Sequence, residues 1–241
     1  MDESTRGTLF GVSVGPGDPE LMTLKAVRIV RAADVVAVPD TGRGPGTAYH
    51  IAREYIAGKG LLACATPMTR DPAATAAAHR KTADAICAFL DAGKDVAYLC
   101  LGDVSVYSSY HYVHRLVVER GYDAQIVPGV TSFCAAAARA GVPLCMGDER
   151  LLVAPLAGAS VDELLDVDAN KALLKPGDKI AHLRASLESR NALDQAVLVE
   201  HCGMEDERVA PHLERADDAG YLSVVLVGSS AVPLSGEGNV R

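Results

Sequence analysis

Short apolar runs alternate with amphipathic stretches through the first half of the chain. The length of the runs favours strands, and the periodicity of the stretches between them favours helices. This alternation is typical of a parallel sheet with helices on its faces. The predicted strands are Leu9 to Val14, Val35 to Val38, Leu61 to Ala65, Val96 to Leu101 and Ala124 to Val127, and the predicted helices are Thr23 to Ala33, Ala48 to Ile56, Ala73 to Ala92 and Ser109 to Arg120.

The pattern changes after the stretch PGVTSFCAAAARAG, whose helix should end near Gly141. Strands and helices alternate less regularly there, which favours a mixed sheet. The predicted strands are Leu151 to Ala154, Ala172 to Lys175, Ala196 to Glu200 and Leu222 to Val227, and the predicted helices are Val161 to Leu165 and Lys179 to Ser189. The sequence therefore predicts an α/β protein of two domains, an α/β domain over residues 1–129 and a mixed α+β domain over residues 130–241.

The formal net charge of −8 and a sequence pI near 5.3 argue against a nucleic-acid or membrane-surface partner, since either would need a basic field. No apolar run approaches the length of a membrane span, and the first residues do not resemble an export signal, so we expect a cytoplasmic protein. The six cysteines form no CxxC pair and show no zinc-like spacing with histidine, which predicts reduced thiols in the core and no metal site.

Three turns that contain glycine each follow a predicted strand of the first domain. GPGDP follows the first strand, LGDVSVY the fourth and PGVTS the fifth. Ligands of open parallel sheets bind beyond the carboxyl ends of the strands. We therefore expect the three turns to open onto one edge of the sheet and to form a binding site there.

The composition of these turns limits the ligand. The spacing of Gly11, Gly15 and Gly17 is not the GxGxxG of a dinucleotide site, and Pro16 lacks an N–H that a phosphate could use. The carboxylates of Asp18 and Asp103 would repel an anion, so a neutral or cationic ligand fits better. The alternative is that the glycines, Asp18 and a helix cap at Thr23 serve local turn geometry alone.

Four ordered segments, VGPGDPELMTLKAV, CLGDVSVYSSYHYV, VPGVTSFCAAAARAGVPL and EHCGMEDERV, resemble the tetrapyrrole (corrin/porphyrin) methylase family over nearly the whole chain. The GDVSVYSSY form, the PMTRDP segment and the CGMEDE run are most similar to the precorrin-2 C(20)-methyltransferase subgroup of cobalamin biosynthesis. The resemblance implies S-adenosylmethionine as methyl donor, bound in a cleft between two domains, a tetrapyrrole substrate and a homodimer. A sulfonium carries positive charge and no phosphate, which agrees with the composition of the turns.

The resemblance also implies site residues. It places Pro16 against the cofactor, with further contacts from Leu101, Gly102, Asp103, Val106, Thr131, Ser132, Lys175, Cys202 and Gly203. Many family members have a proline after the GD pair, where this chain has Val104.

Asp103 is the expected polar group near the methyl, either orienting the cofactor or accepting a proton. Tyr107 and Tyr110 are further catalytic candidates, with Tyr112 nearby, and Tyr110 either stacks on the macrocycle or packs into the core. A tetrapyrrole carries carboxylates, so its binding site should contain cationic side chains. The alternative is that the cationic residues near the motifs are ordinary surface charges. The cationic candidates are Arg70, His111, His114, Lys179 and Arg184.

Two other functions stay open from the sequence. One is methylation at another ring position or of a non-tetrapyrrole acceptor, since substrate choice depends on the site and not on the fold. The other is a regulatory module that binds a nucleotide at the same edge without catalysis.

Overall fold

The computed structural model describes residues 6–42, 44, 46–67, 69, 71–213 and 219–228. The chain divides into two compact units, residues 1–131 and 132–241, which we call unit 1 and unit 2. Among the described residues, no helix is both long and apolar enough to cross a membrane.

Unit 1 contains a five-stranded sheet in the order β3-β2-β4-β1-β5, and every pairing in it is parallel. The prediction of five strands joined by crossovers is confirmed. The strands are β1 (Leu9–Ser13), β2 (Val35–Asp40), β3 (Gly60–Ala65), β4 (Val96–Cys100) and β5 (Ala124–Val127). The carboxyl ends of β4, β1 and β5 lie next to one another, because β1 pairs with both of the others.

Two helices of unit 1 start at residues whose side chains accept a hydrogen bond from a backbone amide of the first turn. Thr23 Oγ1 accepts a hydrogen bond from Ala26 N at 3.1 Å, and Asp71 Oδ1 accepts one from Ala73 N at 2.9 Å. The helices are α1 (Leu24–Ala32), α2 (Thr47–Ala52), α3 (Pro72–Asp91) and α4 (Tyr110–Glu119), with short 3-10 helices at Pro19–Leu21 and Arg53–Tyr55.

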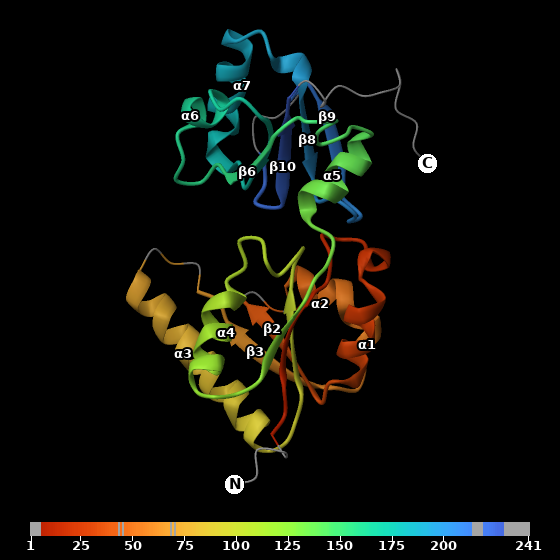
Figure 1. The fold of residues 1–241 in the computed structure, drawn as a ribbon, viewed down its shortest axis with the longest axis vertical. Coiled ribbons are helices and arrows are strands. Elements are labelled where there is room, and N and C mark those ends of the chain that lie inside the picture. Colours follow the sequence, from red (N-terminus) through yellow and green to blue (C-terminus); the bar gives the residue numbers. More distant parts are fainter. Residues whose placement is uncertain are drawn as a thin grey trace. The chain divides into compact units, whose positions relative to one another are not determined.

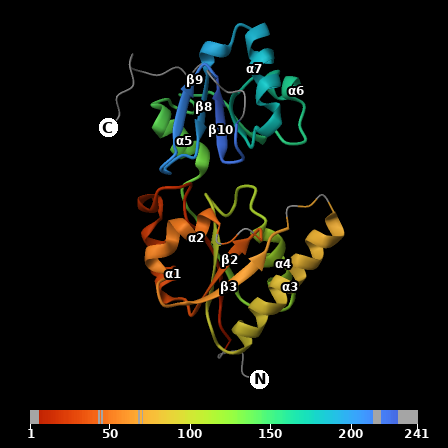
Figure 2. The same ribbon diagram turned by 180° about the vertical axis from the view of Figure 1, so that it is seen from behind.

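Helices α1 and α2 cover one face of this sheet, and α3 and α4 cover the other (Figure 1). The view from behind shows the same arrangement (Figure 2). Each face has its own apolar core: α1 and α2 pack on Val12, Val36 and Leu99, whereas α3 and α4 pack on Leu9 and Tyr98. Strands buried on both faces need apolar residues at almost every position, which explains the continuous runs in the sequence.

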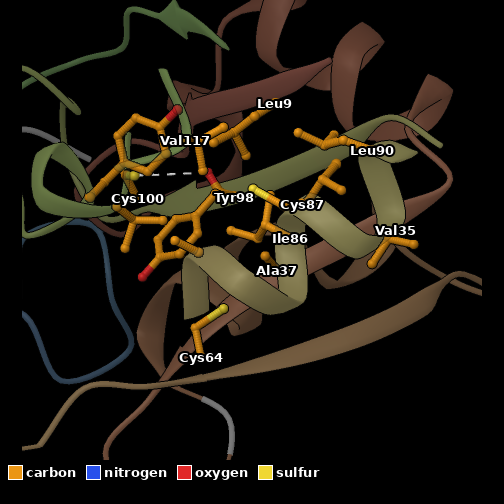
Figure 3. Close-up of a cluster of buried hydrophobic side chains, with 14 of the residues drawn as sticks. Leu9, Val35, Ala37, Cys64, Ile86, Cys87, Leu90, Tyr98, Cys100 and Val117 are labelled. Atoms are coloured by element: carbon orange, nitrogen blue, oxygen red, sulfur yellow. Dashed lines mark hydrogen bonds between the residues drawn. The ribbon is translucent and has the colours of Figure 1, made fainter. Parts of the chain in front are cut away.

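Four of the six cysteines lie in the interior. Cys64, Cys87 and Cys100 are buried among apolar side chains in unit 1 (Figure 3), and Cys202 is buried in unit 2. Burial raises the pKa of the Cys64 and Cys100 thiols to about 12, so both are protonated at neutral pH. The prediction of core thiols is wrong for Cys134 and Cys145, which are exposed.

Unit 2 contains a mixed five-stranded sheet in the order β6-β7-β10-β8-β9, in which only β6 and β7 are parallel among the described pairings. The mixed sheet was expected, but strand β9 was not. The strands are β6 (Leu151–Pro155), β7 (Asn170–Leu174), β8 (Ala196–Glu200), β9 (Arg208–Pro211) and β10 (Ser223–Val227), and the helices are α5 (Ser132–Ala140), α6 (Val161–Leu165) and α7 (Ile180–Ser189).

The face of this sheet that carries α6 and α7 has the apolar core of unit 2. Leu183 and Leu187 of α7 pack with Leu173, Leu198 and Val225 of the central strands. Helix α5 lies against β8 and β10 on the other face (Figure 1). Strands β8 and β10 are therefore covered on both sides, and all residues of β7, β8 and β10 are buried.

Gly11 in β1 leaves space for the ring of Tyr110, which has no exposed surface. A Cβ atom at position 11 would lie 2.2 Å from Tyr110 Cε1. The ring packs against Tyr98, with centroids 5.2 Å apart, and cannot retreat. A side chain at position 11 would therefore displace α4 from the sheet.

We expect Gly11→Ala to lower the free energy of unfolding by about 1–3 kcal/mol, because it overpacks this contact. Gly60→Ala in β3 is the matched control. Its Cβ would meet its nearest neighbours at 3.9 Å or more, so it should be neutral or stabilise the protein by up to about 1 kcal/mol. Denaturant unfolding of both variants measures the difference, and equal midpoints would contradict the packing argument.

Candidate functional site

The turns after β1 and β4 are joined by their backbones. Gly15 N donates to Gly102 O at 3.2 Å, and Gly102 N donates to Gly15 O at 2.8 Å. Both glycines have a positive φ, 78° for Gly15 and 70° for Gly102, which residues with a Cβ rarely adopt. The two turns therefore close on each other at the carboxyl edge of the sheet.

The turn after β5 joins the same edge. Gly129 N donates to Asp103 Oδ2 at 2.7 Å, and Thr23 Oγ1 donates to Pro128 O at 3.5 Å. A Cβ at position 129 would lie 2.4 Å from Ser13 Cβ, so the approach requires glycine. The expectation that the three turns meet at one edge of the sheet is confirmed.

The hydroxyl of Ser13 links the end of β1 to the turn after β4. Its Oγ accepts a hydrogen bond from Val104 N at 2.8 Å, and both residues are fully buried. A proline at position 104 has no N–H and would lose this bond. Val104 therefore fits this turn where a proline would not.

Asp103 is 7% exposed, and its carboxylate is surrounded by donors. Ser105 donates to Oδ1 through its backbone N at 2.8 Å and also through its hydroxyl. Burial raises the pKa of Asp103, but the hydrogen bonds from Ser105 and Gly129 lower it by more, and the net pKa lies below its usual value. The carboxylate is ionised at neutral pH and holds the loops together, which makes it a poor proton acceptor.

The tyrosines differ in their surroundings. Tyr110 is fully buried, and its hydroxyl lies 3.1 Å from His114 Nδ1, so the prediction that its ring stacks on a macrocycle is wrong and the inward-packed alternative holds. Tyr107 is 52% exposed with φ of 49°, and it lies in the turn that follows Asp103. Tyr112 is also exposed and stacks on His79, with ring centroids 5.1 Å apart.

The cationic candidates are only partly available to bind carboxylates. Burial and the neighbouring His111 lower the pKa of His114, which favours the neutral ring at neutral pH. Lys179 Nζ donates to Ala159 O, and Arg184 is half-buried in α7. Arg70 lies outside the described residues.

The predicted cofactor residues of unit 1 lie around the joined turns. Pro16 and Gly102 are buried, whereas Leu101, Val106 and Thr131 are half-buried. Asp18 accepts a hydrogen bond from Glu20 N at 2.8 Å and caps a short 3-10 helix, so its role is the local one.

The predicted residues of unit 2 lie on one edge of its sheet, apart from Ser132, which begins α5. Lys175 follows β7, and Cys202 and Gly203 follow β8. Gly203 N donates to Glu207 Oε2 at 2.7 Å, and Glu207 Oε1 accepts from Arg139 Nε of α5 at 2.7 Å. The turn after β8 is therefore held by an ion pair that the sequence analysis did not find.

Unit 2 also has a cavity of about 460 Å³, lined by residues that include Glu149, Lys171 and Arg190. It lies where β6, β7 and β8 begin and β10 ends, and no predicted site residue lines it. Arg190 is paired with Asp162 and Asp166 there.

The chemistry of the joined turns fits a sulfonium compound. The segments GPGDP, LGDVSVY and PGVTS contain no lysine, arginine or histidine, and their buried carboxylate is ionised. The lack of cationic side chains and the presence of a carboxylate disfavour binding of a phosphate and favour binding of a positively charged group. Among the described residues, no three His, Cys, Asp or Glu side chains gather as metal ligands.

Sequence reasoning missed Ser13 and Ser105. A serine inside the apolar run of β1 was the available signal for Ser13, since a buried hydroxyl in a strand needs a partner. Ser105 follows Asp103 by two residues, the spacing at which an aspartate side chain bonds nearby backbone amides.

The sequence profile of the tetrapyrrole (corrin/porphyrin) methylases matches residues 8–216. The chain belongs to this family, as the sequence motifs indicated. S-adenosylmethionine, the predicted cofactor, is the methyl donor of these enzymes.

Three curated relatives define the similarity further. The cobalamin biosynthesis protein CobIJ of Mycobacterium bovis is 38% identical over 220 residues, which are 86% of this chain and 43% of that protein. This chain thus spans less than half of the length of CobIJ. A precorrin-2 C(20)-methyltransferase of a Sinorhizobium species is 34% identical, with 92% of this chain and 95% of that protein covered. A cobalt-precorrin-2 C(20)-methyltransferase of Salmonella typhimurium is 31% identical, with 92% and 96% covered.

Solved structures share the fold. The cobalt precorrin-4 methyltransferase CbiF superposes with a TM-score of 0.76 at 21% identity, covering 97% of this chain and 99% of that one. Uroporphyrin-III C-methyl transferase from Thermus thermophilus, complexed with S-adenosyl homocysteine, superposes with a TM-score of 0.68 at 20% identity, covering 93% of each chain. Both confirm the predicted fold class.

We expect Asp103→Asn to lower the free energy of unfolding by about 1–3 kcal/mol at neutral pH, because the charged acceptor of three donors is lost. The folded-state pKa of Asp103 is below its usual value, so its stabilisation is present above about pH 4 and is lost as the pH falls further. The difference between variant and wild type should therefore shrink below that pH.

Asp84→Asn is the control for the loss of one carboxylate in unit 1. Its partner is Arg120 at 2.7 Å on an exposed surface, so the change should cost less than about 1 kcal/mol. Denaturant unfolding at pH 7, 4 and 3 compares the variants. An Asp103→Asn protein as stable as wild type at pH 7 would contradict the proposed role of the carboxylate.

Proposed function

We propose that this protein is an S-adenosylmethionine-dependent C-methyltransferase that methylates carbon 20 of precorrin-2, or of its cobalt complex, in cobalamin biosynthesis. The observation that supports this most is similarity along nearly the full length of two C(20)-methyltransferases, at 34% and 31% identity. The joined turns of unit 1 add the chemical support, since they suit a cationic donor. The homodimer implied by the family is part of the same proposal.

Bound S-adenosylmethionine supplies an electrophilic methyl group on a positively charged sulfur. We assign its binding to the backbone of the joined turns, with Pro16 and the segment from Leu101 to Asp103 closest to it. The ionised Asp103 stabilises positive charge nearby without leaving its hydrogen bonds. In unit 2, Lys175, Cys202 and Gly203 complete the proposed set.

Rigid positioning is the main contribution that these residues make. The acceptor carbon of an electron-rich macrocycle is its own nucleophile, so the protein need only align the two reactants and exclude water. Alignment of this kind can supply about 7–11 kcal/mol of the barrier. The mutual hydrogen bonds of Gly15, Gly102, Asp103 and Gly129 provide that rigidity. Asp103 is not assigned as the group that removes a proton from the methylated carbon.

The test is a methylation assay with purified protein, S-adenosylmethionine and one of three acceptors: precorrin-2, cobalt-precorrin-2 or uroporphyrinogen III. We expect a gain of one methyl group, detected by mass spectrometry, on one of the first two acceptors and none on the third. Methylation of uroporphyrinogen III instead would move the proposal to another ring position.

Calorimetric titration separates an enzyme from a regulatory nucleotide-binding module. S-adenosylhomocysteine should bind, whereas ATP and NAD should not, because the turns offer a phosphate no cation. Tight binding of ATP or NAD without binding of S-adenosylhomocysteine would overturn the assignment of this edge to a sulfonium donor.

A further inference from the structure

Lys175 has a backbone conformation that favours glycine. Its φ is 53°, and its N–H is bonded to Ser223 O at 3.3 Å, which fixes it beside the start of β10. Lysine in the left-handed region costs conformational energy that glycine would avoid. Strained residues of this kind cluster at functional sites, so the side chain at position 175 needs an explanation.

The ammonium of Lys175 also differs from several other cations in unit 2. In unit 2, Arg139 and Arg208 pair with carboxylates, and Lys171 and Lys179 donate to backbone carbonyls. Within the described residues, no carboxylate or carbonyl oxygen accepts a hydrogen bond from Lys175 Nζ. It lies instead 5.0 Å from the ring centroid of Tyr221, which is 60% exposed.

The contact with Tyr221 orients the ammonium without neutralising it. A cation over an aromatic face gains attraction from the ring but keeps its full charge and its three donors. The contact restrains the long side chain of Lys175, so less side-chain conformational entropy is lost when a ligand binds to the ammonium. Lys175 is therefore prepared to bind an anion.

Two acidic residues that follow β8, Asp206 and Glu207, have partners of their own. His201 follows β8, and its N–H is bonded to Leu222 O at 2.9 Å, so it flanks the start of β10 on the other side from Lys175. His201 Nδ1 lies 2.6 Å from Asp206 Oδ2, and Glu207 is bonded to Arg139. Among the described residues, these two carboxylates are therefore engaged locally.

We propose that Lys175, held over Tyr221, binds a carboxylate of a reactant. The inference rests on the proposed function, because that function supplies two carboxylate sources: the side chains of the tetrapyrrole and the methionine part of the donor. Both present the same chemistry to an ammonium, and the experiment distinguishes them.

Lys175→Met removes the charge and keeps the stem, and Lys175→Arg keeps the charge. Lys94→Met is the matched control, since Lys94 Nζ also lies over an aromatic ring, 5.9 Å from the centroid of Phe89. Lys94 precedes the amino end of β4, whereas Lys175 follows the carboxyl end of β7. Three dissociation constants are measured for each protein: S-adenosylhomocysteine, methylthioadenosine, which lacks the carboxylate, and cobalt-precorrin-2 in the presence of S-adenosylhomocysteine.

If the tetrapyrrole supplies the carboxylate, Lys175→Met weakens cobalt-precorrin-2 binding by about 10- to 100-fold and leaves both nucleosides unchanged. If the donor supplies it, S-adenosylhomocysteine binding weakens by a similar factor and methylthioadenosine binding does not. In either case Lys175→Arg recovers most of the loss. Lys175→Met binding all three ligands within twofold of Lys94→Met overturns the inference.

Lys175→Gly separates binding from folding. It relieves the positive φ, so we expect a melting temperature at or above that of wild type together with the same weakened binding. A variant that loses stability in proportion to binding would assign the side chain a structural role and overturn the inference. Wild-type protein that binds these ligands but methylates no tetrapyrrole would instead contradict the proposed function, since none of these constants depends on turnover.

Discussion

The hydrogen bonds of Asp103 are the constraint on which the candidate site depends. One carboxylate oxygen holds the amide of Gly129, and the other holds Ser105, so a single side chain joins the ends of β4 and β5. Ser13 and the Gly15–Gly102 pair add β1 to the same assembly. Loops at the edge of a parallel sheet normally diverge, and here hydrogen bonds join three of them to one another.

The same bonds determine what Asp103 can do chemically. A carboxylate that accepts several hydrogen bonds is stabilised in its charged form and resists protonation. It therefore contributes a fixed negative charge and rigidity, and the three turn segments that it joins contain no lysine, arginine or histidine. The neutral tetrapyrrole face and the cationic donor are the kinds of partner that this combination suits, whereas polyphosphates are not.

The sequence predicted strands β1, β2 and β4 of unit 1 well because strands that are buried on both faces have continuous apolar runs. Strand β9 (Arg208–Pro211) was missed because an edge strand with a charged first residue and a final proline has no such run. The convergence of the turns followed from topology, but the inward position of Tyr110 did not. Helical spacing predicts which residues of α4 share one side with Tyr110, but it does not predict which way that side faces. The space that Gly11 leaves for the Tyr110 ring shows that it faces the sheet.

Each unit has its own sheet and its own apolar core, and aromatic chromophores are distributed unequally between them. The chain has no tryptophan, and every tyrosine except Tyr221 lies in unit 1. Tyrosine emission and near-ultraviolet dichroism consequently follow the melting of unit 1 almost alone, while amide dichroism and calorimetry follow both. Comparing the two kinds of signal on unlabelled protein reveals whether the halves melt as one cooperative block or in succession.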